Sequence, residues 1–294
     1  MKMKLSDFLD QSKEKIEVAM SSYVESLNTP DLLKDAMLYS LEAGGKRLRP
    51  ILVLALLHTY NKQEDIGIST ACAVEMIHTY SLIHDDLPCM DDDDLRRGKP
   101  TNHKVFGEAM AVLAGDGLLT QSFSLIVNDS KPSPEKRLRI ISELVYAAGV
   151  EGMVGGQVAD MEGEAKSLSL EQLQYIHEHK TAKLLGFSIV SGAILADAPE
   201  DDIEKLRTFA YHLGIAFQIR DDILDIEGQQ ELIGKPIGSD ILNEKTTYPS
   251  ILTIDGAKEK LDSHIKEAKS LLNSLSVKSD LLIEICDLIA TRNH

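Results

Sequence analysis

The stretch PEDDIEKLRTFAYHLGIAFQIRDDILDI, residues 199–226, decides the fold class. Its apolar residues recur at three- and four-residue spacing: Leu206, Phe209, Ala210, Leu213 and Phe217. That period places them on one face of an α-helix. The same spacing recurs through most of the chain, and alternating strand patterns bounded by hairpin turns are absent from the sequence. We therefore predict an all-α fold.

Clusters of glycine, proline and serine separate the periodic runs, and none of these breaks is long enough for a flexible interdomain linker. No repeat of fixed period is present. We therefore predict a single domain, residues 1–294. The predicted helices cover residues 6–27, 31–43, 50–60, 69–87, 107–128, 134–148, 151–164, 170–178, 181–196, 199–226, 246–254, 257–273 and 277–291.

The bulk composition limits the possible partners. The 294 residues include 47 acidic and 31 basic ones, which gives a formal net charge of -16. This charge repels the phosphate backbone of nucleic acids, and it repels anionic membrane surfaces as well. Clustered cations or bound metal ions can reverse the field locally, so a phosphorylated small molecule is still a suitable ligand. We predict small-molecule partners and no nucleic acid.

Three features bear on the location of the protein. Cys72, Cys89 and Cys286 are far apart and lack the spacing of a metal site or a disulfide framework. Residues 1–10 contain no apolar stretch typical of a signal peptide. The uncharged stretch 184–196 is shorter than the roughly 20 residues that a membrane-spanning helix needs. We expect a buried core helix there, a cytoplasmic location and no stable membrane insertion.

The first acid cluster, HDDLPCMDDDD, occupies residues 84–94 and follows an apolar helical run. On a straight helix Asp85 and Asp91 would lie about 120° apart, too far to share a ligand easily. Pro88 cannot continue the helix, and should let Asp91 fold back toward Asp85. Gathered carboxylates are the hard oxygen ligands that suit Mg²⁺. A solvated acidic loop is the alternative interpretation.

The second acid cluster is QIRDDILD, residues 218–225. Asp221 and Asp225 are one helical turn apart on the same face, so they can hold one cation together. Their neighbours are apolar, and like charges at this spacing repel unless something neutralises them. A metal ion or a set of lysines would do so. The occurrence of two such clusters favours several metal ions that hold one polyanion, for which a diphosphate is the natural candidate.

The positions of the cations are informative in so acidic a chain. The segment GGKRLRP, residues 44–50, places three of them in a glycine-opened loop before a hydrophobic helix, which suits an anion. Neither this loop nor the segment around Lys235 has the pattern of a nucleotide-binding P-loop. Arg96 and Arg97 follow the first acid cluster directly. They can bind phosphate oxygens, or they can simply balance the aspartates.

Lysine and histidine positions leave further alternatives open. Lys180 precedes the uncharged core helix, where its side chain either snorkels or points into a cavity. His177 and His179 lie on different sides of their helix and do not make a zinc pair. His78, on the helix that leads to Asp85, is either a histidine of the core or part of the site.

The ordered set of motifs resembles the trans-isoprenyl diphosphate synthases, the polyprenyl synthetase family. They follow the family order over nearly the whole chain. The matching segments are GGKRLRP (44–50), DDLPCMD with RRG (85–98), GGQ (155–157), HKT (179–181), FQIRDDILD (217–225) and KTTYP (245–249).

The resemblance implies a homodimer of isoprenoid synthase-type helical bundles, each around a central cavity with the two acid clusters on opposing walls. It also implies diphosphate substrates and about three Mg²⁺ ions per active site. The implied metal ligands are Asp85, Asp86, Asp91, Asp221, Asp222 and Asp225. The implied contacts with the allylic diphosphate are Arg96, Lys180, Thr181, Gln218, Lys235 and Lys245. The implied contacts with isopentenyl diphosphate are Lys46, Arg49, His78 and Arg97. The implied catalytic residues are Asp85, Asp91, Arg96, Lys180 and Asp221.

The activity that the resemblance implies is the condensation of an allylic diphosphate with isopentenyl diphosphate. Tyr80 and Ser81, one helical turn before Asp85, would limit the length of the product. Together with the extra residues Leu87 and Pro88, the bulky Tyr80 ring resembles the bacterial synthases that stop at C15, and a C20 product is the alternative. A terpene cyclase would usually lack the cations that hold isopentenyl diphosphate, and an inactive binding partner would have lost an acid cluster.

Overall fold

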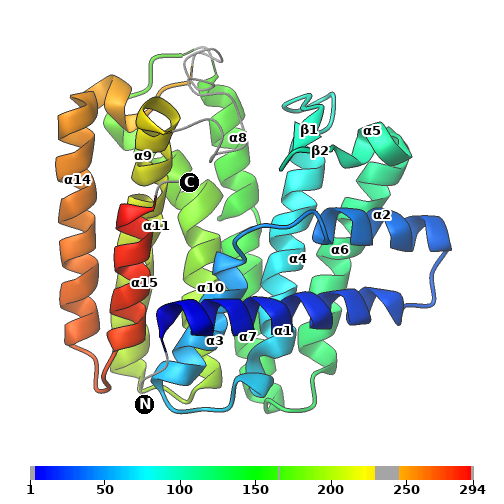
Figure 1. The fold of residues 1–294 in the computed structure, drawn as a ribbon, viewed down its shortest axis with the longest axis horizontal. Coiled ribbons are helices and arrows are strands. Elements are labelled where there is room, and N and C mark those ends of the chain that lie inside the picture. Colours follow the sequence, from blue (N-terminus) through cyan, green and yellow to red (C-terminus); the bar gives the residue numbers. More distant parts are fainter. Residues whose placement is uncertain (1–3, 165, 229–244, 293–294) are drawn as a thin grey trace. The chain divides into compact units, whose positions relative to one another are not determined.

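The computed structural model in Figure 1 confirms the predicted all-α class. It describes residues 4–164, 166–228 and 245–292. The chain divides into two compact units: unit 1 comprises residues 1–54 and 63–141, and unit 2 comprises residues 55–62 and 142–294. The sequence predicts that the two units form a single domain, and this stays a prediction.

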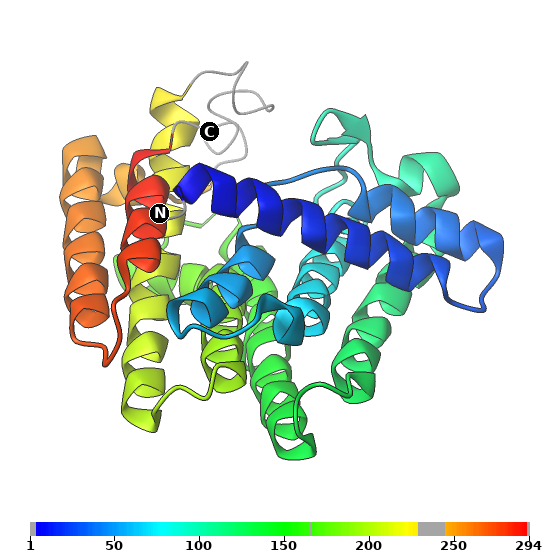
Figure 2. The same cartoon turned by 60° about the horizontal axis from the view of Figure 1, so that its bottom comes forward.

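Unit 1 is built on α4 (Ile68–Asp85) and α6 (Glu108–Asn128), which pack along one another (Figure 1). Every residue of α4 from Ser69 to Ile77 is buried, because this helix is apolar on nearly all sides. Two further helices, α1 (Leu5–Glu25) and α2 (Asp31–Leu41), lie side by side in both views (Figures 1 and 2). The smaller elements are η1 (Glu64–Gly67), β1 (Leu95–Arg96), β2 (Lys99–Pro100) and α5 (Asn102–Phe106).

Unit 2 is built on α11 (Glu200–Glu227), which packs against α10 (Lys183–Leu195), α14 (Tyr248–Asn273) and α15 (Asp280–Thr291). Both views show α14 and α15 side by side (Figures 1 and 2). Burial of nearly all of α10 confirms the predicted core helix. The remaining elements of unit 2 are α8 (Met153–Gly163), α9 (Leu170–Ile176) and the π-helix η2 (His177–Ala182), while α3 (Leu48–Thr59) and α7 (Pro134–Ala148) have residues in both units.

Most predicted helices agree with the structure to within a turn, and the exceptions have local causes. The predicted helices 246–254 and 257–273 correspond to α14, in which two helical stretches join across a kink at Thr253 with φ of 68°, within a few residues of the predicted break. The strands β1 and β2 are two residues long each, too short to show alternation. The predicted helix 181–196 begins inside the π-helix η2, and α10 itself starts at Lys183.

Two helical segments among the described residues are long and apolar enough to cross a membrane by length and composition alone. In Glu64–Asp85, 72% of the apolar window is buried inside the protein, as expected for a core helix. In Glu108–Asn128 the buried share is 39%. The second segment therefore has an apolar face that unit 1 leaves uncovered, with Val112 and Leu113 exposed.

Candidate active site

The first acid cluster begins where α4 ends, at Asp85, three residues before Pro88. The backbone N–H of Asp91 donates a hydrogen bond to the carbonyl oxygen of Asp85, with an N–O distance of 2.9 Å. The chain therefore folds back at Pro88, as predicted, and returns the backbone of Asp91 to the end of the helix. The side chains of residues 91–94 are exposed.

Asp86 differs from its neighbours because it is only 2% exposed. Arg96 of β1 donates to Asp86 Oδ1 from Nε at 2.6 Å and from Nη2 at 2.5 Å. Burial raises the pKa of Asp86, and the Arg96 guanidinium opposes this rise. Arg96 thus balances an aspartate, which was one of the two alternatives for it. Its predicted contact with a diphosphate stays a prediction.

The turn between β1 and β2 places Arg97 against the glycine-opened loop. Arg97 and Gly98 both have positive φ, 53° and 76°, which is the geometry of a tight two-residue hairpin turn. The Arg97 guanidinium donates to the carbonyl of Gly44. A Cβ on Gly45 would lie only 2.8 Å from that guanidinium, so the missing side chain provides its space.

Several of the residues predicted to contact isopentenyl diphosphate lie close to His78. Burial is the largest cause that lowers the pKa of His78 well below its usual value, and the charges of Arg49 and Arg97 lower it further. The structure therefore brings Arg49, His78 and Arg97 together within unit 1 and keeps the imidazole neutral. Lys46 is exposed in the loop before α3, the helix to which Arg49 belongs.

Arg47 differs from the exposed Lys46 beside it because its side chain is buried inside unit 1. It is 2% exposed, and its Nη1 donates to the equally buried Glu75 at 2.8 Å. Its Nε donates to Glu17 at 3.1 Å. The sequence motif does not distinguish its three cations, but their burial does: Arg47 ties the loop to α1 and α4.

Tyr80 lies on α4 one turn before the first acid cluster, and its ring is 7% exposed. The ring stands edge-on to His84, with 5.7 Å between the centroids. Burial and the charge of Asp85 raise the pKa of Tyr80 to about 12, so the phenol stays neutral. The Ser81 hydroxyl donates to the carbonyl of His78 at 2.9 Å and so faces its own helix.

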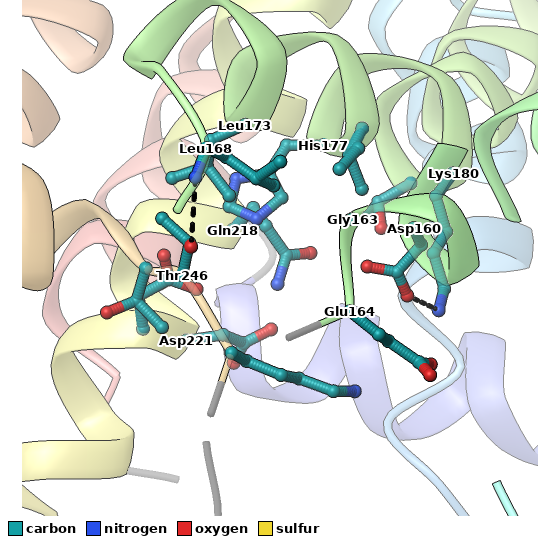
Figure 3. A pocket seen from close by; sticks show the side chains of 15 residues that line it. Asp160, Gly163, Glu164, Leu168, Leu173, His177, Lys180, Gln218, Asp221 and Thr246 are labelled. Carbon is teal, nitrogen blue, oxygen red and sulfur yellow. Dashed lines mark hydrogen bonds and ion pairs between the residues drawn. The ribbon is translucent and has the colours of Figure 1, made fainter. Parts of the chain in front are cut away.

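A cavity of about 260 Å³ in unit 2 contains most of the predicted contacts with the allylic diphosphate (Figure 3). The predicted residues that line it are Lys180, Thr181, Gln218, Asp221, Asp222 and Lys245. They come from η2, from α11 and from the segment before α14. Asp225 is buried and does not line the cavity. Lys235 lies outside the described residues.

Lys180 points into this cavity, which decides between the two alternatives for it. Its Nζ donates to Asp160 Oδ2 of α8 at 2.6 Å, as Figure 3 shows. A Cβ on Gly156 would collide with the backbone nitrogen of Lys180, so only glycine lets α8 approach η2 this closely. Asp160 was not among the predicted site residues. The segment GGQ, one turn before it, is the sequence signal that points to it.

Asp221 and Asp222 are held by partners far along the chain. The backbone N–H of Tyr248, at the start of α14, donates to Asp222 Oδ2 at 2.9 Å. A carboxylate at the N-terminus of a helix also stabilises the helix dipole. Arg292 Nη2 donates to Asp221 Oδ1 at 2.7 Å, and the Asp221 side chain is 40% exposed. Asp221 therefore keeps access to the cavity, whereas Asp222 is 5% exposed.

His177 and His179 have different environments, although both belong to η2. His177 lines the cavity and packs against Tyr248, with 5.5 Å between ring centroids. Burial lowers the pKa of His177 to about 3, so its imidazole is neutral. His179 instead stacks on Tyr175 with a centroid distance of 3.9 Å. A π-helical segment such as η2 often marks a functional site.

The charges around the cavity determine what it can bind. Among the described residues, its lining includes the carboxylates of Asp160, Glu164, Asp221 and Asp222 and the two lysines Lys180 and Lys245. A net negative lining repels a diphosphate unless divalent cations enter with it.

Each acid cluster can supply some, but not all, of the ligands that such a metal ion needs. Among the described residues, no group of three His, Cys, Asp or Glu side chains forms a ready metal site. Mg²⁺ commonly takes only one or two carboxylates and completes its shell with water and substrate phosphate. The carboxylates of Asp221 and Asp222 at the cavity wall match this requirement.

Comparison with known proteins identifies the family. The sequence profile of the polyprenyl synthetase family matches residues 30–278. The chain is 67% identical to the farnesyl diphosphate synthase of Bacillus subtilis (strain 168) over 293 residues, 99% of each chain. It is 57% identical to the farnesyl diphosphate synthase of Geobacillus stearothermophilus over 294 residues, again 99% of each. The geranylgeranyl pyrophosphate synthetase of Pyrococcus horikoshii Ot3 has a similar structure, with a TM-score of 0.89, 30% identity and 98% coverage of both chains.

The chain therefore belongs to the polyprenyl synthetase family, which confirms the resemblance found in its motifs. Membership implies a requirement for a divalent metal. The first acid cluster belongs to unit 1 and the second to unit 2. That the two clusters share one cavity is implied by the family resemblance and stays a prediction.

Proposed function

We propose that this protein condenses dimethylallyl or geranyl diphosphate with isopentenyl diphosphate to give (2E,6E)-farnesyl diphosphate and diphosphate. The observation that carries the proposal is the convergence of Lys180, Gln218, Asp221 and Lys245 on one cavity. The full-length identity of 67% to a farnesyl diphosphate synthase supports the C15 product. A geranylgeranyl pyrophosphate synthase, that of Capsicum annuum, is less similar, with 50% identity over 269 residues.

The allylic diphosphate occupies the cavity of unit 2 in this proposal. Lys180 and Lys245 neutralise its oxygens, and Lys180 exchanges its bond with Asp160 for one with phosphate. Gln218 and Thr181 donate neutral hydrogen bonds, with Arg96 and Lys235 as further contacts. Mg²⁺, when bound, neutralises the charge that develops on the departing diphosphate. About three such ions would be held by Asp85, Asp86, Asp91, Asp221, Asp222 and Asp225.

Isopentenyl diphosphate binds at the cations of unit 1. Arg49 and Arg97 offer planar pairs of N–H donors that match phosphate oxygens. His78 is neutral because of burial and its arginine neighbours, so it donates one hydrogen bond without adding a charge. Lys46 completes this set from the exposed side of the loop.

The reaction needs no nucleophilic side chain. The C–O bond of the allylic diphosphate breaks, and its electron pair leaves with the diphosphate. The isopentenyl double bond then forms the new C–C bond at the allylic cation, and the released diphosphate takes the proton that is lost. Arg96 and Lys180 neutralise the leaving group, and Asp85, Asp91 and Asp221 would position it through bound Mg²⁺.

Tyr80 limits the product to C15. Its ring is buried one turn before Asp85 and stays neutral, so it presents a bulky apolar wall to the growing chain. Ser81, whose hydroxyl is bonded to its own helix, adds no polar group to that wall. A C20 product is the second candidate, since the same fold makes it in the archaeal enzyme of similar structure.

The proposal includes the assembly and location of the protein. Residues 1–294 form one synthase domain, because the family profile spans both units. The exposed apolar face of α6 around Val112 and Leu113 packs against a second copy in a homodimer. The protein is cytoplasmic and does not insert stably into membranes. Sedimentation of a Leu113→Lys variant as a monomer, and of the unsubstituted protein as a dimer, would support this interface.

A product assay tests the proposed activity. The purified protein with Mg²⁺ is given geranyl and isopentenyl diphosphates, and the dephosphorylated products are separated by chromatography. We expect mainly the C15 alcohol. A predominant C20 product would contradict the assigned length, and the absence of any prenyl product would contradict the assigned class.

A further inference from the structure

Arg292, the residue after α15, is built into the second acid cluster although it lies 71 positions from Asp221. Its Nη2 donates to Asp221 Oδ1 at 2.7 Å and to the carbonyl of Phe217 at 2.9 Å. Its guanidinium carbon lies 3.8 Å from the centre of the Phe217 ring. The side chain is 9% exposed.

The backbone of Arg292 is fixed as well. Arg220, on the same turn of α11 as Asp221, donates from Nε and Nη2 to the carbonyl of Arg292, at 2.9 and 2.6 Å. The ion pair with Asp221, the contact with the Phe217 ring and the hydrogen bonds to the backbone carbonyl together fix the position of the Arg292 guanidinium. Arg292 is therefore an integral part of the second acid cluster and not an exposed surface residue.

This position puts a fixed positive charge on a carboxylate that borders the cavity. An arginine stays protonated at any physiological pH. A divalent cation bound to Asp221 would sit about 2.1 Å from a carboxylate oxygen, close to the guanidinium and repelled by it. The repulsion persists whether the ion shares the carboxylate with Arg292 or displaces it.

A diphosphate changes this balance. Its oxygens carry several negative charges and supply the remaining ligands of the metal, so they offset the repulsion from Arg292. Without diphosphate, Arg292 already neutralises the charge of Asp221, so a metal ion gains little binding free energy there. Metal binding should therefore depend on the substrate more strongly than a bare pair of carboxylates would allow.

We propose that Arg292 is a counter-cation of Asp221 that makes divalent-metal binding at the second acid cluster conditional on a bound diphosphate. The inference rests on the proposed function, because it assumes that Asp221 is a metal ligand. Arg292 is a positioning residue: it contacts the carboxylate of Asp221 and is not among the described residues that line the cavity.

Metal binding without turnover tests the proposal. Free Mn²⁺ is measured by electron paramagnetic resonance during titration of the full-length protein, with and without inorganic diphosphate. We expect Arg292→Gln to bind Mn²⁺ about tenfold more tightly than the unsubstituted protein when diphosphate is absent. This size follows from the effect of one adjacent charge on the proton affinity of a carboxylate, which is roughly tenfold or more. With diphosphate present, the difference should shrink to less than about threefold.

Matched variants separate the charge of Arg292 from its packing. Arg292→Lys keeps the charge and should bind Mn²⁺ like the unsubstituted protein. Arg292→Met keeps the apolar contact with the Phe217 ring and should follow Arg292→Gln, even if the glutamine variant folds poorly. Lys269→Gln makes the same charge change at the exposed Lys269–Asp287 pair and should have no effect.

The outcomes distinguish this inference from the proposed function. Unchanged or weaker Mn²⁺ binding by both Arg292→Gln and Arg292→Met, in a protein that makes farnesyl diphosphate, would overturn the role of Arg292 alone. Equal tightening by Arg292→Lys would show that packing, not charge, controls the metal and would overturn it too. A protein that forms no prenyl product would instead contradict the proposed function, whatever the Mn²⁺ titration shows.

Discussion

The two acid clusters are alike in composition and different in how the chain supports them. In the first, the acids follow the end of α4, residues 91–94 are exposed, and the buried Asp86 is balanced by Arg96, ten residues later. In the second, the acids stay on the continuous helix α11. Their partners there are Tyr248 and Arg292, which are distant in sequence.

This difference separates two ways of making carboxylates available to a metal. The first acid cluster carries its own counter-charge within one short segment, so a proline and a hairpin turn are enough to shape it. The second acid cluster depends on α14 and on the residue after α15, so it forms only when unit 2 is folded. Variants in each cluster should therefore fail in different ways.

The largest expected effect comes from removing one carboxylate from each cluster. We expect Asp85→Asn and Asp221→Asn each to lower kcat about a thousandfold or more, which corresponds to about 4 kcal/mol of transition-state stabilisation. The measurement is steady-state formation of farnesyl diphosphate at saturating Mg²⁺.

Asp92→Asn is the matched control for this pair. Asp92 is exposed and has φ of 51°, a backbone conformation that asparagine tolerates. We expect its kcat to stay within about threefold of the unsubstituted protein. Near-normal activity of Asp85→Asn would mean that the first acid cluster is only a solvated loop.

A smaller effect, on stability, should follow from Arg96→Gln. The substitution leaves the buried Asp86 without its partner, and we expect a loss of about 2 kcal/mol in the free energy of unfolding. Urea denaturation at neutral pH measures it. Lys104→Gln, which breaks the exposed pair with Asp94, should cause no measurable change. Equal losses of stability in the two variants would show that the buried Asp86 does not need the charge of Arg96.

The product length should depend on the helix of the first acid cluster and not on the second. We expect Tyr80→Ala to raise the ratio of C20 to C15 products about tenfold, or about 1.4 kcal/mol in the competition between elongation and release. Tyr80→Phe keeps the ring and should keep the C15 product. An unchanged profile for Tyr80→Ala would place the end of the chain pocket at another residue.

The smallest expected effect is a pH dependence of stability that involves His177 of unit 2. Burial lowers the pKa of His177 to about 3 in the folded protein, whereas the unfolded value is about 6.5. Between these values the unfolded state binds more protons, so the free energy of unfolding falls as the pH falls. The loss from this group is about 1 kcal/mol between pH 6.5 and 5.5.

His177→Gln should lose that part of the acid sensitivity. Its urea stability curve should decline less between pH 6.5 and 5.5 than the curve of the unsubstituted protein. Other buried histidines, such as His264, contribute equally to both proteins and cancel in the comparison. Parallel curves would show that His177 is protonated to the same extent in the folded and unfolded states.

Much of the fold and of the first acid cluster could be predicted because the causes are local. Apolar spacing places the helices, and Pro88 ends α4 and returns Asp91 to Asp85. The burial of α10 follows from the uncharged stretch 184–195, which makes up all of the helix after Lys183. The break predicted between helices 246–254 and 257–273 lies within a few residues of the kink at Thr253. The π-turn of η2 was not predicted, because no glycine or proline marks it in the sequence.

The sequence by itself determined the helical class, the two acid clusters and the residues that should contact a diphosphate. Only the tertiary structure decided which side chain each of them meets: Arg47 pairs inward with Glu75, Lys180 with Asp160, and Asp221 with Arg292. The physical reason is that spacing along a chain specifies the face of a helix, whereas burial and ion pairing depend on which helices pack together.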